Sequence, residues 1–503
     1  MKTTAFSAAW RVALTFALLW LLTALFVGLT PTHYVSSDAT NNLDYIAQDN
    51  RFELWHGQHL LALWPGYFTA RLLDVGPYQA MRLAHAILAG ATVAVFYLAL
   101  RTLVSSSRIA VGVAIALCFS YGFWHYASDP DIYMAGYAAI ALLLLALVAA
   151  LRAPGVARIV WLGLAASLAI LTHQMNVEIA GLIGLALIGL AARPGGIRVR
   201  WHHVAIYALA SLTPVLLLYL FGWREVSAWL VSQGESAPGF IDWALRYFGA
   251  AQSGAATWGV TLSPGTLPVA VYAIIQSWIL PPLALDPLSL LILGLLVVGV
   301  GVVAARFLVT ARGLGPVERV VALVCALSLL ANAVSGWWWQ AGNIKFYLFM
   351  QLYVLVLVAL VGRSALRETA ARRLSTVGLA ALGGGLVLAQ LLFTLPYETQ
   401  GGVFRLVDRY GDRADVKLYI QDSTQDRMIE YVSERSARGL PAEDCQNLPN
   451  YGRRRHVQIW VLSAERARDC RLEGATFVER YFADRSRTVW EIWDVTPITT
   501  SAE

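Results

Sequence analysis

Carboxylates and imidazoles are concentrated in the stretch 32–64, between the first two long apolar runs. Asp38 and Asp44 follow the first run, and the stretch continues through His56-Gly-Gln-His59 into a tryptophan-containing segment. A carboxylate can act as general base towards a hydroxyl group, and a cation or imidazole stabilises charge that develops on a departing group. These residue types at this spacing predict an active site at a membrane face.

Three later segments carry polar residues of the same kinds where apolar runs end. They are Ser128-Asp129-Pro130-Asp131, Thr172-His173-Gln174 with Glu178 close behind, and Trp337-Trp338-Trp339 followed by Lys345. Glu178 falls inside an apolar run, where a charge costs about 2.5–3.5 kcal/mol on insertion scales. We therefore expect Glu178 to face an internal wet cavity, and all four segments to meet on one face.

The elements that position these residues must be membrane helices. The chain of 503 residues is 58% hydrophobic and 14% charged, with a mean hydropathy of +0.58, which excludes an ordinary soluble globular protein. A hydrocarbon core of ~30 Å needs ~20 apolar residues per helix. The sequence predicts an all-α multi-pass membrane protein with about eleven spans, near 10–29, 81–103, 109–126, 132–151, 157–172, 176–192, 203–222, 288–306, 318–335, 345–362 and 375–395.

Charge asymmetry predicts the orientation of these spans. With the N-terminus inside, the cytoplasmic connections hold mainly arginines, whereas the opposite connections hold mainly acids. The run Leu267–Leu280 is short and precedes two prolines, so we interpret it as a re-entrant or interfacial helix. The net charge of +6 follows from this topology and does not indicate nucleic-acid binding.

The C-terminal tail, 396–503, has a different composition and is predicted to form a small extracytoplasmic α/β domain behind a transmembrane domain, 1–395. Residues 457–462 and 489–495 have strand patterns, and 426–438 has a helical one. Cys445 and Cys470 lie in this tail, and an extracytoplasmic compartment permits their pairing as a disulfide. Cys118 and Cys325 lie inside apolar runs and are expected to be small buried hydrophobes.

The sequence has no Walker loop, dinucleotide fingerprint or zinc spacing. It also lacks a small-residue cleavage site after its first apolar run, which is therefore predicted to stay as an anchor. Any chemistry must then draw on a substrate that arrives already activated, through or from the membrane.

The arrangement of the outer loops resembles the GT-C class of integral-membrane glycosyltransferases, which includes protein O-mannosyltransferases and lipid A aminoarabinose transferases. Ser37-Asp38 with Leu43-Asp44-Tyr45 resembles the carboxylate motif of the first outer loop, and Ser128-Asp129-Pro130-Asp131 resembles the second acidic motif. The segment from His59 to Tyr67 is similar to the one in which members often carry a His- or Lys-Pro-Pro-Leu-Tyr run. Leu171-Thr-His173-Gln174 resembles a histidine motif. The resemblance covers about 30–395.

This resemblance implies transfer of a sugar from a polyprenyl-phosphate donor to a glycan, lipid or protein acceptor, on the outer face of the plasma (inner) membrane. The general base would be Asp38 or Asp44, and a single in-line displacement would invert the anomeric centre. The phosphate would be neutralised by cations, and the remaining polar residues would bind substrate; together these candidates are His59, Arg71, Arg82, Asp129, Asp131, His173, Glu178 and Lys345.

The cofactor question stays open at this point. Some members of the class use a divalent metal ion and others do not, and Asp129 and Asp131 are the candidate ligands here. The tryptophans of 337–339 are candidates for stacking on the sugar or the lipid, besides their role in an aromatic belt.

Other interpretations remain for these residues and for the whole chain. Asp38, Asp129 and Asp131 could serve as helix caps, and Lys345 could reach to the interface without binding a ligand. A lipid or glycan transporter or flippase would instead place charges along a path through the bilayer, with repeated broken helices. A non-catalytic assembly or sensor protein explains the tail but not the four polar segments.

Overall fold

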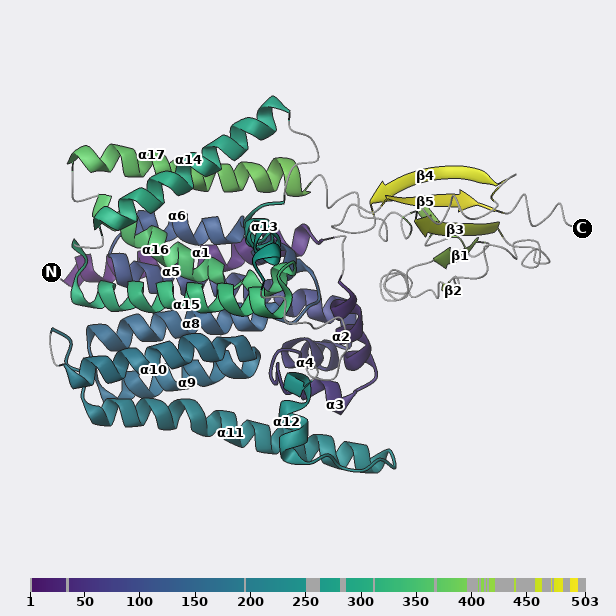
Figure 1. Cartoon of the computed structure of the whole chain (residues 1–503), viewed down its shortest axis with the longest axis horizontal. Coiled ribbons are helices and arrows are strands. Elements are labelled where there is room, and N and C mark those ends of the chain that lie inside the picture. Colours follow the sequence, from purple (N-terminus) through teal and green to yellow (C-terminus); the bar gives the residue numbers. More distant parts are fainter. Residues whose placement is uncertain are drawn as a thin grey trace, which may run out of the picture.

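The computed structural model has a helical body and, towards the C-terminus, a β-sheet (Figure 1). The structure describes residues 2–32, 36–193, 196–249, 263–280, 286–310, 313–365, 369–395, 406, 409–410, 413, 416–420, 438–439, 457–463, 472, 475–482 and 489–495.

Nine helices in these ranges are long and apolar enough to cross a membrane. They are Ala9–Leu29 within α1 (Lys2–Leu29), Pro77–Val104 (α5), Tyr133–Arg152 (α8), Gln174–Ala192 (η1, Gln174–Asn176, and α10, Val177–Ala192), Trp201–Ser232 (α11), Pro287–Arg306 within α14 (Pro287–Thr310), Pro316–Gln340 (α15), Ile344–Arg363 (η4, Ile344–Tyr347, and most of α16, Met350–Ala365) and Val377–Thr394 (most of α17, Thr369–Ala389, and η5, Gln390–Thr394). The chain is a multi-pass α-helical membrane protein, as the sequence predicts.

Of the other two predicted spans, one is bent and the other is a short helix. Span 109–126 is a pair of helices, α6 (Ser107–Cys118) and α7 (Tyr121–Ser128), bent by 60°. The bend falls at Ser120, which adopts an extended backbone, with φ −77° and ψ 135°. Span 157–172 is α9 (Val156–Thr172), with 17 residues. The predicted count of eleven is therefore approximate.

The short run before the two prolines forms a short helix, α13 (Leu267–Trp278), which follows η2 (Pro264–Thr266). With 12 residues α13 is too short to cross a membrane. The carbonyl of Ser277 near its end accepts a hydrogen bond from the buried Gln351 amide of α16. Its length agrees with the prediction that this run is not a full membrane span.

The helical body has a central group and an outer group of helices. Within their apolar windows, α5, α8 and α16 bury 67%, 72% and 78% of residues, whereas α1 and α11 bury 17% and 11%. Gly90 of α5 allows α1 to approach closely, since a Cβ at this position would lie 2.4 Å from the Trp20 carbonyl oxygen. Cys118 and Cys325 are buried, as expected for small core hydrophobes.

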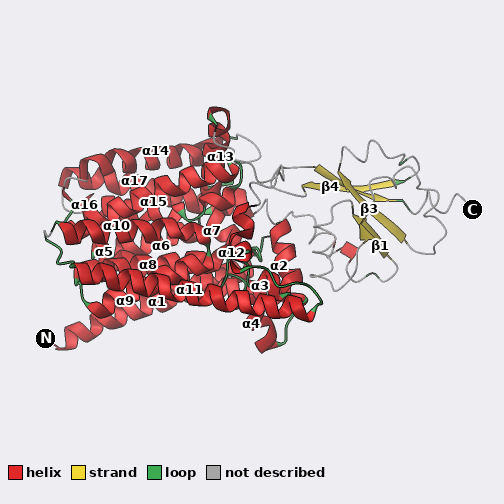
Figure 2. Ribbon diagram, turned by 60° about the horizontal axis from the view of Figure 1, so that its bottom comes forward, coloured by secondary structure: helices red, strands yellow, loops and turns green. Residues whose placement is uncertain are grey.

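The first outer stretch is helical rather than an extended loop. It contains α2 (Ser37–Ala47), α3 (Arg51–Leu54) and α4 (Trp64–Leu73), at the end of the helical body that lies towards the strands (Figure 2). The Ser36 hydroxyl caps α2 by accepting a hydrogen bond from the Ala39 N–H (3.1 Å). Asp38 therefore lies in the first turn of a helix, where the helix dipole stabilises a negative charge.

The C-terminal region contains a five-stranded mixed sheet. Its strand order is β2 (Arg438–Gly439), β1 (Val416–Ile420), β3 (Val457–Ser463), β5 (Val489–Asp494) and β4 (Thr476–Phe482). β1 pairs in parallel with β2 and β3, whereas β5 pairs antiparallel with β3 and β4. Ile459 and Val461, two residues apart, are both buried, which is the strand period.

Both strands predicted in the tail are confirmed, as β3 and β5. The predicted helix 426–438 lies outside the described residues, except for Arg438, which belongs to β2. Cys445 and Cys470 also lie outside them, so their disulfide stays a prediction. Helix α12 (Phe240–Gly249) completes the described elements and contacts α11.

Candidate active site

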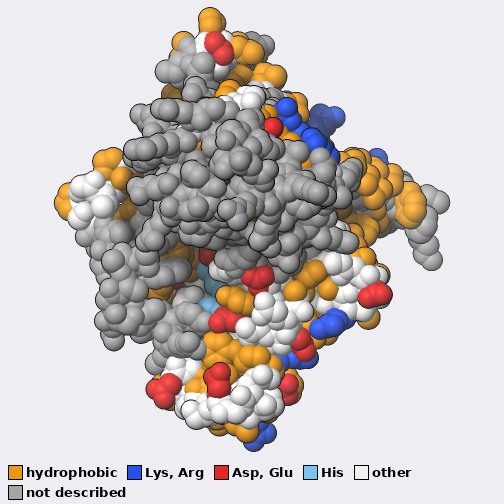
Figure 3. All heavy atoms as spheres, turned by 90° about the vertical axis from the view of Figure 1, so that its right-hand side faces the viewer, with side chains coloured by type: hydrophobic (Ala, Val, Ile, Leu, Met, Phe, Trp, Pro, Cys, Tyr) orange, Lys and Arg blue, Asp and Glu red, His pale blue; other side chains and the backbone are white. Residues whose placement is uncertain are grey.

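A cavity of about 510 Å³ opens where the polar segments meet. It is lined by α2, the α3–α4 connection, the turns before α8 and α10, the end of α15, and η4. Figure 3 shows histidine side chains within a hollow on this face, with acidic side chains close by. Four segments far apart in the sequence thus form one site.

Hydrogen bonds join the first outer stretch to the other segments. The Thr32 N–H donates to the Ser128 hydroxyl (3.1 Å), which ties the end of α1 to α7. The Leu61 N–H donates to the Leu171 carbonyl (2.9 Å), and the Gln174 N–H donates to the Gln58 carbonyl (3.0 Å). The last two bonds place the residues around His59 directly beside the turn before α10.

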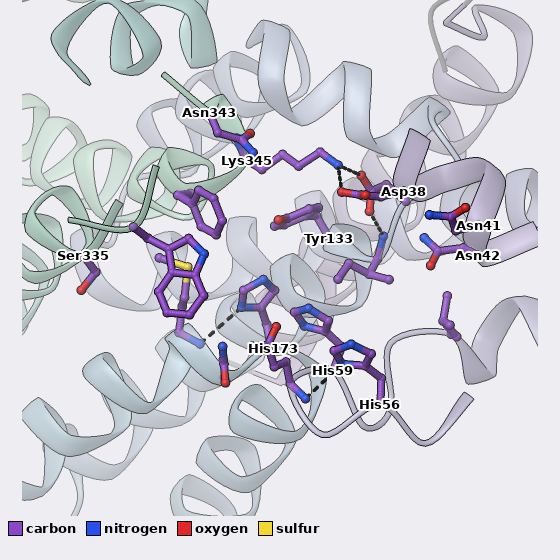
Figure 4. Close-up of a pocket in the computed structure, with 18 of the residues that line it drawn as sticks. Asp38, Asn41, Asn42, His56, His59, Tyr133, His173, Ser335, Asn343 and Lys345 are labelled. Carbon is purple, nitrogen blue, oxygen red and sulfur yellow. Dashed lines mark hydrogen bonds and ion pairs between the residues drawn. The ribbon is translucent and has the colours of Figure 1, made fainter. Parts of the chain in front are cut away.

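A lysine bridges two carboxylates at one end of the cavity (Figure 4). Lys345 Nζ lies 2.6 Å from Asp38 Oδ2 and 2.7 Å from Asp131 Oδ2. Lys345 belongs to η4, whose first N–H groups are capped by the Asn343 side chain (3.1 Å to the Lys345 N–H). The ammonium is therefore fixed between α2 and the turn before α8.

The two carboxylates that Lys345 binds are not equivalent. The side chain of Asp131 is 1% exposed, whereas that of Asp38 is 56% exposed. Asp131 also accepts hydrogen bonds from the Ile132 N–H (2.8 Å) and the Ser36 hydroxyl (3.2 Å). Burial raises the pKa of Asp131, but the Lys345 ammonium and these donors outweigh burial and hold that pKa below its usual value. Asp131 is a fixed anion and Asp38 an accessible one.

Asp129 lies close in sequence to Asp131 but does not line the cavity. Its Oδ2 is 3.6 Å from Nε2 of His125, and both side chains are fully buried. Its carbonyl accepts a hydrogen bond from Nδ1 of His85 (3.0 Å). Asp129 therefore joins α5 and α7 inside the helical body.

The carboxylates proposed as metal ligands do not form a metal site in this arrangement. Asp131 is already paired with the Lys345 ammonium, and Asp129 is directed to His125. The described residues contain no cluster of three or more His, Cys, Asp or Glu side chains suited to a metal ion.

Three histidines line the wall away from the ion pairs. The ring centroids of His56 and His59 are 5.2 Å apart, and those of His59 and His173 are 4.5 Å apart. Burial, followed by the neighbouring His173, lowers the pKa of His59, and burial lowers the pKa of His173 to about 3. Both imidazoles are therefore neutral at physiological pH.

The far side of the cavity combines a carboxyl group with aromatic rings. Glu178 lines it and accepts a hydrogen bond from the Ser335 hydroxyl, so it faces an internal space rather than lipid. Trp338 and Trp339 also line the cavity, whereas Trp337 donates from Nε1 to the Thr266 hydroxyl (2.9 Å) and does not.

Besides Asp129, three more of the predicted site residues lie away from the cavity. Asp44 is on α2 but does not line the space. The Arg71 guanidinium lies over the Tyr67 ring at 5.3 Å. Arg82 donates to the Gly28 carbonyl (2.9 Å). Among the described residues, Lys345 is the cationic side chain that lines the cavity.

Sequence reasoning did not single out His56 or Tyr133, which also line the cavity. The position of His56 in the His56-Gly-Gln-His59 segment was the available signal. Tyr133 follows the acidic motif directly, but nothing in its sequence context distinguishes it from an interfacial aromatic residue.

Comparison with known protein families and with curated proteins finds no match to this sequence. Among solved structures, ArnT from Cupriavidus metallidurans in the apo state is similar over 97% of this chain and 99% of its own, with TM-score 0.58 and 14% identity. ArnT bound to undecaprenyl phosphate matches over 96% and 98%, with TM-score 0.57 and 15% identity. The chain has the GT-C fold.

The oligosaccharyltransferase AglB from Archaeoglobus fulgidus, in complex with an inhibitory peptide and a dolichol-phosphate, is a more distant similar structure. It matches 91% of this chain and 70% of its own, with TM-score 0.50 and 12% identity. The ArnT similarity covers nearly the whole chain, so it includes the C-terminal region as well as the helical body.

Proposed function

We propose that this protein is a membrane glycosyltransferase that moves a sugar from a polyprenyl-phosphate donor to an acceptor hydroxyl. The observation that carries the proposal is the lysine of the cavity, which is shared by a buried and an exposed carboxylate. The fold supports it, since the similar structures of ArnT and AglB hold undecaprenyl phosphate and dolichol-phosphate.

In this proposal Lys345 binds the phosphate of the donor. An ammonium is a strong partner for phosphate oxygens, and its attraction strengthens in a water-poor site. Asp131 keeps Lys345 in place, since it is buried and is itself held by hydrogen bonds that it accepts from the Ile132 N–H and the Ser36 hydroxyl.

Asp38 acts as the general base of the transfer. The acceptor oxygen attacks the anomeric carbon as its proton passes to the Asp38 carboxylate. The bond from that carbon to the phosphate oxygen breaks, and the polyprenyl phosphate leaves with its negative charge beside Lys345. A single displacement of this kind inverts the anomeric centre.

The resting ion pair implies an order of events. Lys345 donates a hydrogen bond to Asp38 Oδ2 (2.6 Å). In this state that carboxylate oxygen is engaged by the ammonium and is less available to accept a proton. An incoming phosphate competes for the ammonium with the accessible Asp38 more readily than with the buried Asp131. Donor binding therefore releases Asp38 to accept the proton, and the donor binds before the acceptor reacts.

The proposal places the cavity and the C-terminal domain (396–503) on the extracytoplasmic side of the plasma membrane, with the transmembrane domain ending at 395. The distribution of arginines and acids supports this orientation. A reporter fused after Glu503 should be active only outside, and activity only in the cytoplasm would contradict the orientation.

The rate of sugar transfer by the variant Asp38→Asn tests the proposed function. Loss of a general base typically costs 10²–10⁴-fold, so transfer from a radiolabelled polyprenyl-phosphate sugar in native membranes should fall by roughly that factor. Asp44→Asn is the matched control, because Asp44 is on the same helix but away from the cavity. Unchanged transfer in Asp38→Asn would exclude Asp38 as the base, and donor movement across vesicles without transfer would favour a flippase.

A further inference from the structure

His85 of α5 does not line the cavity, but it contacts the backbone of the turn that carries Asp131. Nδ1 of His85 lies 3.0 Å from the carbonyl oxygen of Asp129. Because a carbonyl oxygen can only accept a hydrogen bond, Nδ1 carries the proton and donates it. His85 is buried, and α5 is among the most buried helices of the helical body. A fixed donor on a central helix therefore holds the segment that presents Asp131.

The same carbonyl oxygen also closes the turn. It accepts a hydrogen bond from the Asp131 N–H (2.7 Å), and a bond between residues two apart makes a γ-turn, here centred on Pro130. Proline fixes φ near −65°, close to the value of about −75° that an inverse γ-turn requires. The Asp129 carbonyl thus both shapes the turn and ties it to α5.

From this turn the carboxylate of Asp131 reaches the cation of the cavity. Its Oδ2 lies 2.7 Å from Nζ of Lys345 and 3.2 Å from the Ser36 hydroxyl, which donates to it. These contacts hold the carboxylate, whereas the Asp129 carbonyl holds the backbone from which the carboxylate projects. The contacts therefore run from His85, through the Asp129 carbonyl, to the carboxylate that fixes Lys345.

We propose that His85 is a positioning residue of the active site, which keeps the turn 129–131 in the conformation that fixes Lys345 for the donor phosphate. The inference rests on the proposed function and adds to it a residue that touches no substrate. Without the Nδ1–H donor, the turn populates other conformations, and the fraction of molecules that can bind phosphate falls. The apparent Kd for the phosphate rises as that fraction falls.

Binding of farnesyl phosphate to the full-length protein in nanodiscs tests the inference. His85→Leu removes the donor and should raise the Kd by roughly 2- to 10-fold, the factor that one net hydrogen bond is worth. His85→Asn places an amide N–H as many bonds from the backbone as Nδ1–H, so its Kd should stay close to that of wild type. His85→Gln has its N–H one bond further out and should give an intermediate Kd.

Two further comparisons separate positioning from general support of the fold. If His85 acts through Asp131, His85→Leu should change the Kd much less in an Asp131→Ala background than in wild type. Tyr207→Phe is the matched control, because it removes a buried hydrogen bond to the Ala180 carbonyl (2.6 Å), between α11 and α10 and away from the cavity. It should lower the unfolding temperature and leave the Kd unchanged.

Three results would overturn the inference. They are a wild-type Kd in His85→Leu, a loss of affinity in His85→Asn as large as that in His85→Leu, and an equally large effect of His85→Leu in the Asp131→Ala background. If wild type itself does not bind farnesyl phosphate, the proposed function fails, and this inference with it.

Discussion

The two ends of the segment from η4 to α16 each hold a cation paired with carboxylate, but the two ion pairs are built differently. Lys345 is shared by two carboxylates beside a cavity, and one of them, Asp38, keeps 56% of its side chain exposed. Arg363 binds the single carboxylate of Glu318, whose side chain is 9% exposed, and also donates to the Leu103 carbonyl (3.3 Å).

The difference separates a site that can exchange partners from one that holds helices together. Arg363 joins α16 to α15 and α5 with one anion and one carbonyl, and within the described part of the chain no second carboxylate pairs with it. Lys345 pairs with two carboxylates, and the second of them, Asp38, is accessible. An incoming anion can therefore replace Asp38 while Asp131 keeps the lysine in position.

Removing the cation of the cavity should have the largest effect. Lys345→Met leaves Asp131 buried without its counter-ion, and breaking a buried pair in this way costs about 3–5 kcal/mol. Thermal unfolding should shift strongly downwards, and farnesyl phosphate binding should be lost.

The double variant Lys345→Met/Asp131→Asn separates these two effects. It removes the unpaired charge and should recover much of the stability but none of the lipid binding. A folded Lys345→Met protein that binds farnesyl phosphate like wild type would show that the cavity-end pair is structural, as the Arg363 pair is.

Breaking the other ion pair should affect stability alone. Glu318→Gln weakens a charged hydrogen bond, for which about 1.5–3 kcal/mol is typical, so the unfolding temperature should fall. Transfer per folded molecule should stay at the wild-type level. A loss of transfer as large as that in Asp38→Asn would mean that the two ends are functionally coupled.

Acid should destabilise the cavity end through its histidines. Burial lowers the pKa of His173 to about 3, whereas an unfolded histidine titrates near 6.5. The unfolded state therefore binds a proton that the folded state refuses, and stability falls as the pH drops below about 6.5, by up to ~1.4 kcal/mol per pH unit for one such group. Above about pH 6.5 His173 is neutral in both states, so its full contribution to the unfolding free energy is present.

The variant His173→Phe isolates this effect. Its unfolding free energy should depend less steeply on pH between about 6.5 and 4 than that of wild type. If the unfolding free energies of wild type and His173→Phe depend equally on pH in this range, His173 takes up its proton in the folded protein as well. The ionised Asp131 affects only a more acidic range, because the Lys345 ammonium holds its pKa below the usual value.

The sequence predicted the elements better than the side-chain partners. Apolar runs of membrane length identify the helices, and the outer segments carrying Asp38, Asp131, His173 and Lys345 do meet. The bend at Ser120 was missed because both halves of that run are apolar, and a periodic pattern does not record a local change of backbone direction.

Partner choice depends on packing that the sequence does not encode locally. Asp129 and Asp131 have the same chemistry and nearly the same position, yet one pairs with His125 in the interior and the other with Lys345 at the cavity. Arg71 and Arg82 were predicted for the phosphate from charge alone, but they lie over the Tyr67 and Tyr78 rings, and Arg82 also donates to a carbonyl of α1.

The affinity of Asp38→Asn for bare farnesyl phosphate tests the exchange at Lys345 most directly. Asparagine removes the anion that competes with the phosphate for the ammonium, so the Kd should be equal to or lower than that of wild type, although transfer is lost. Asp44→Asn should leave the Kd unchanged. A Kd several-fold higher in Asp38→Asn than in wild type would contradict the account, because Asp38 would then support the lysine rather than compete for it.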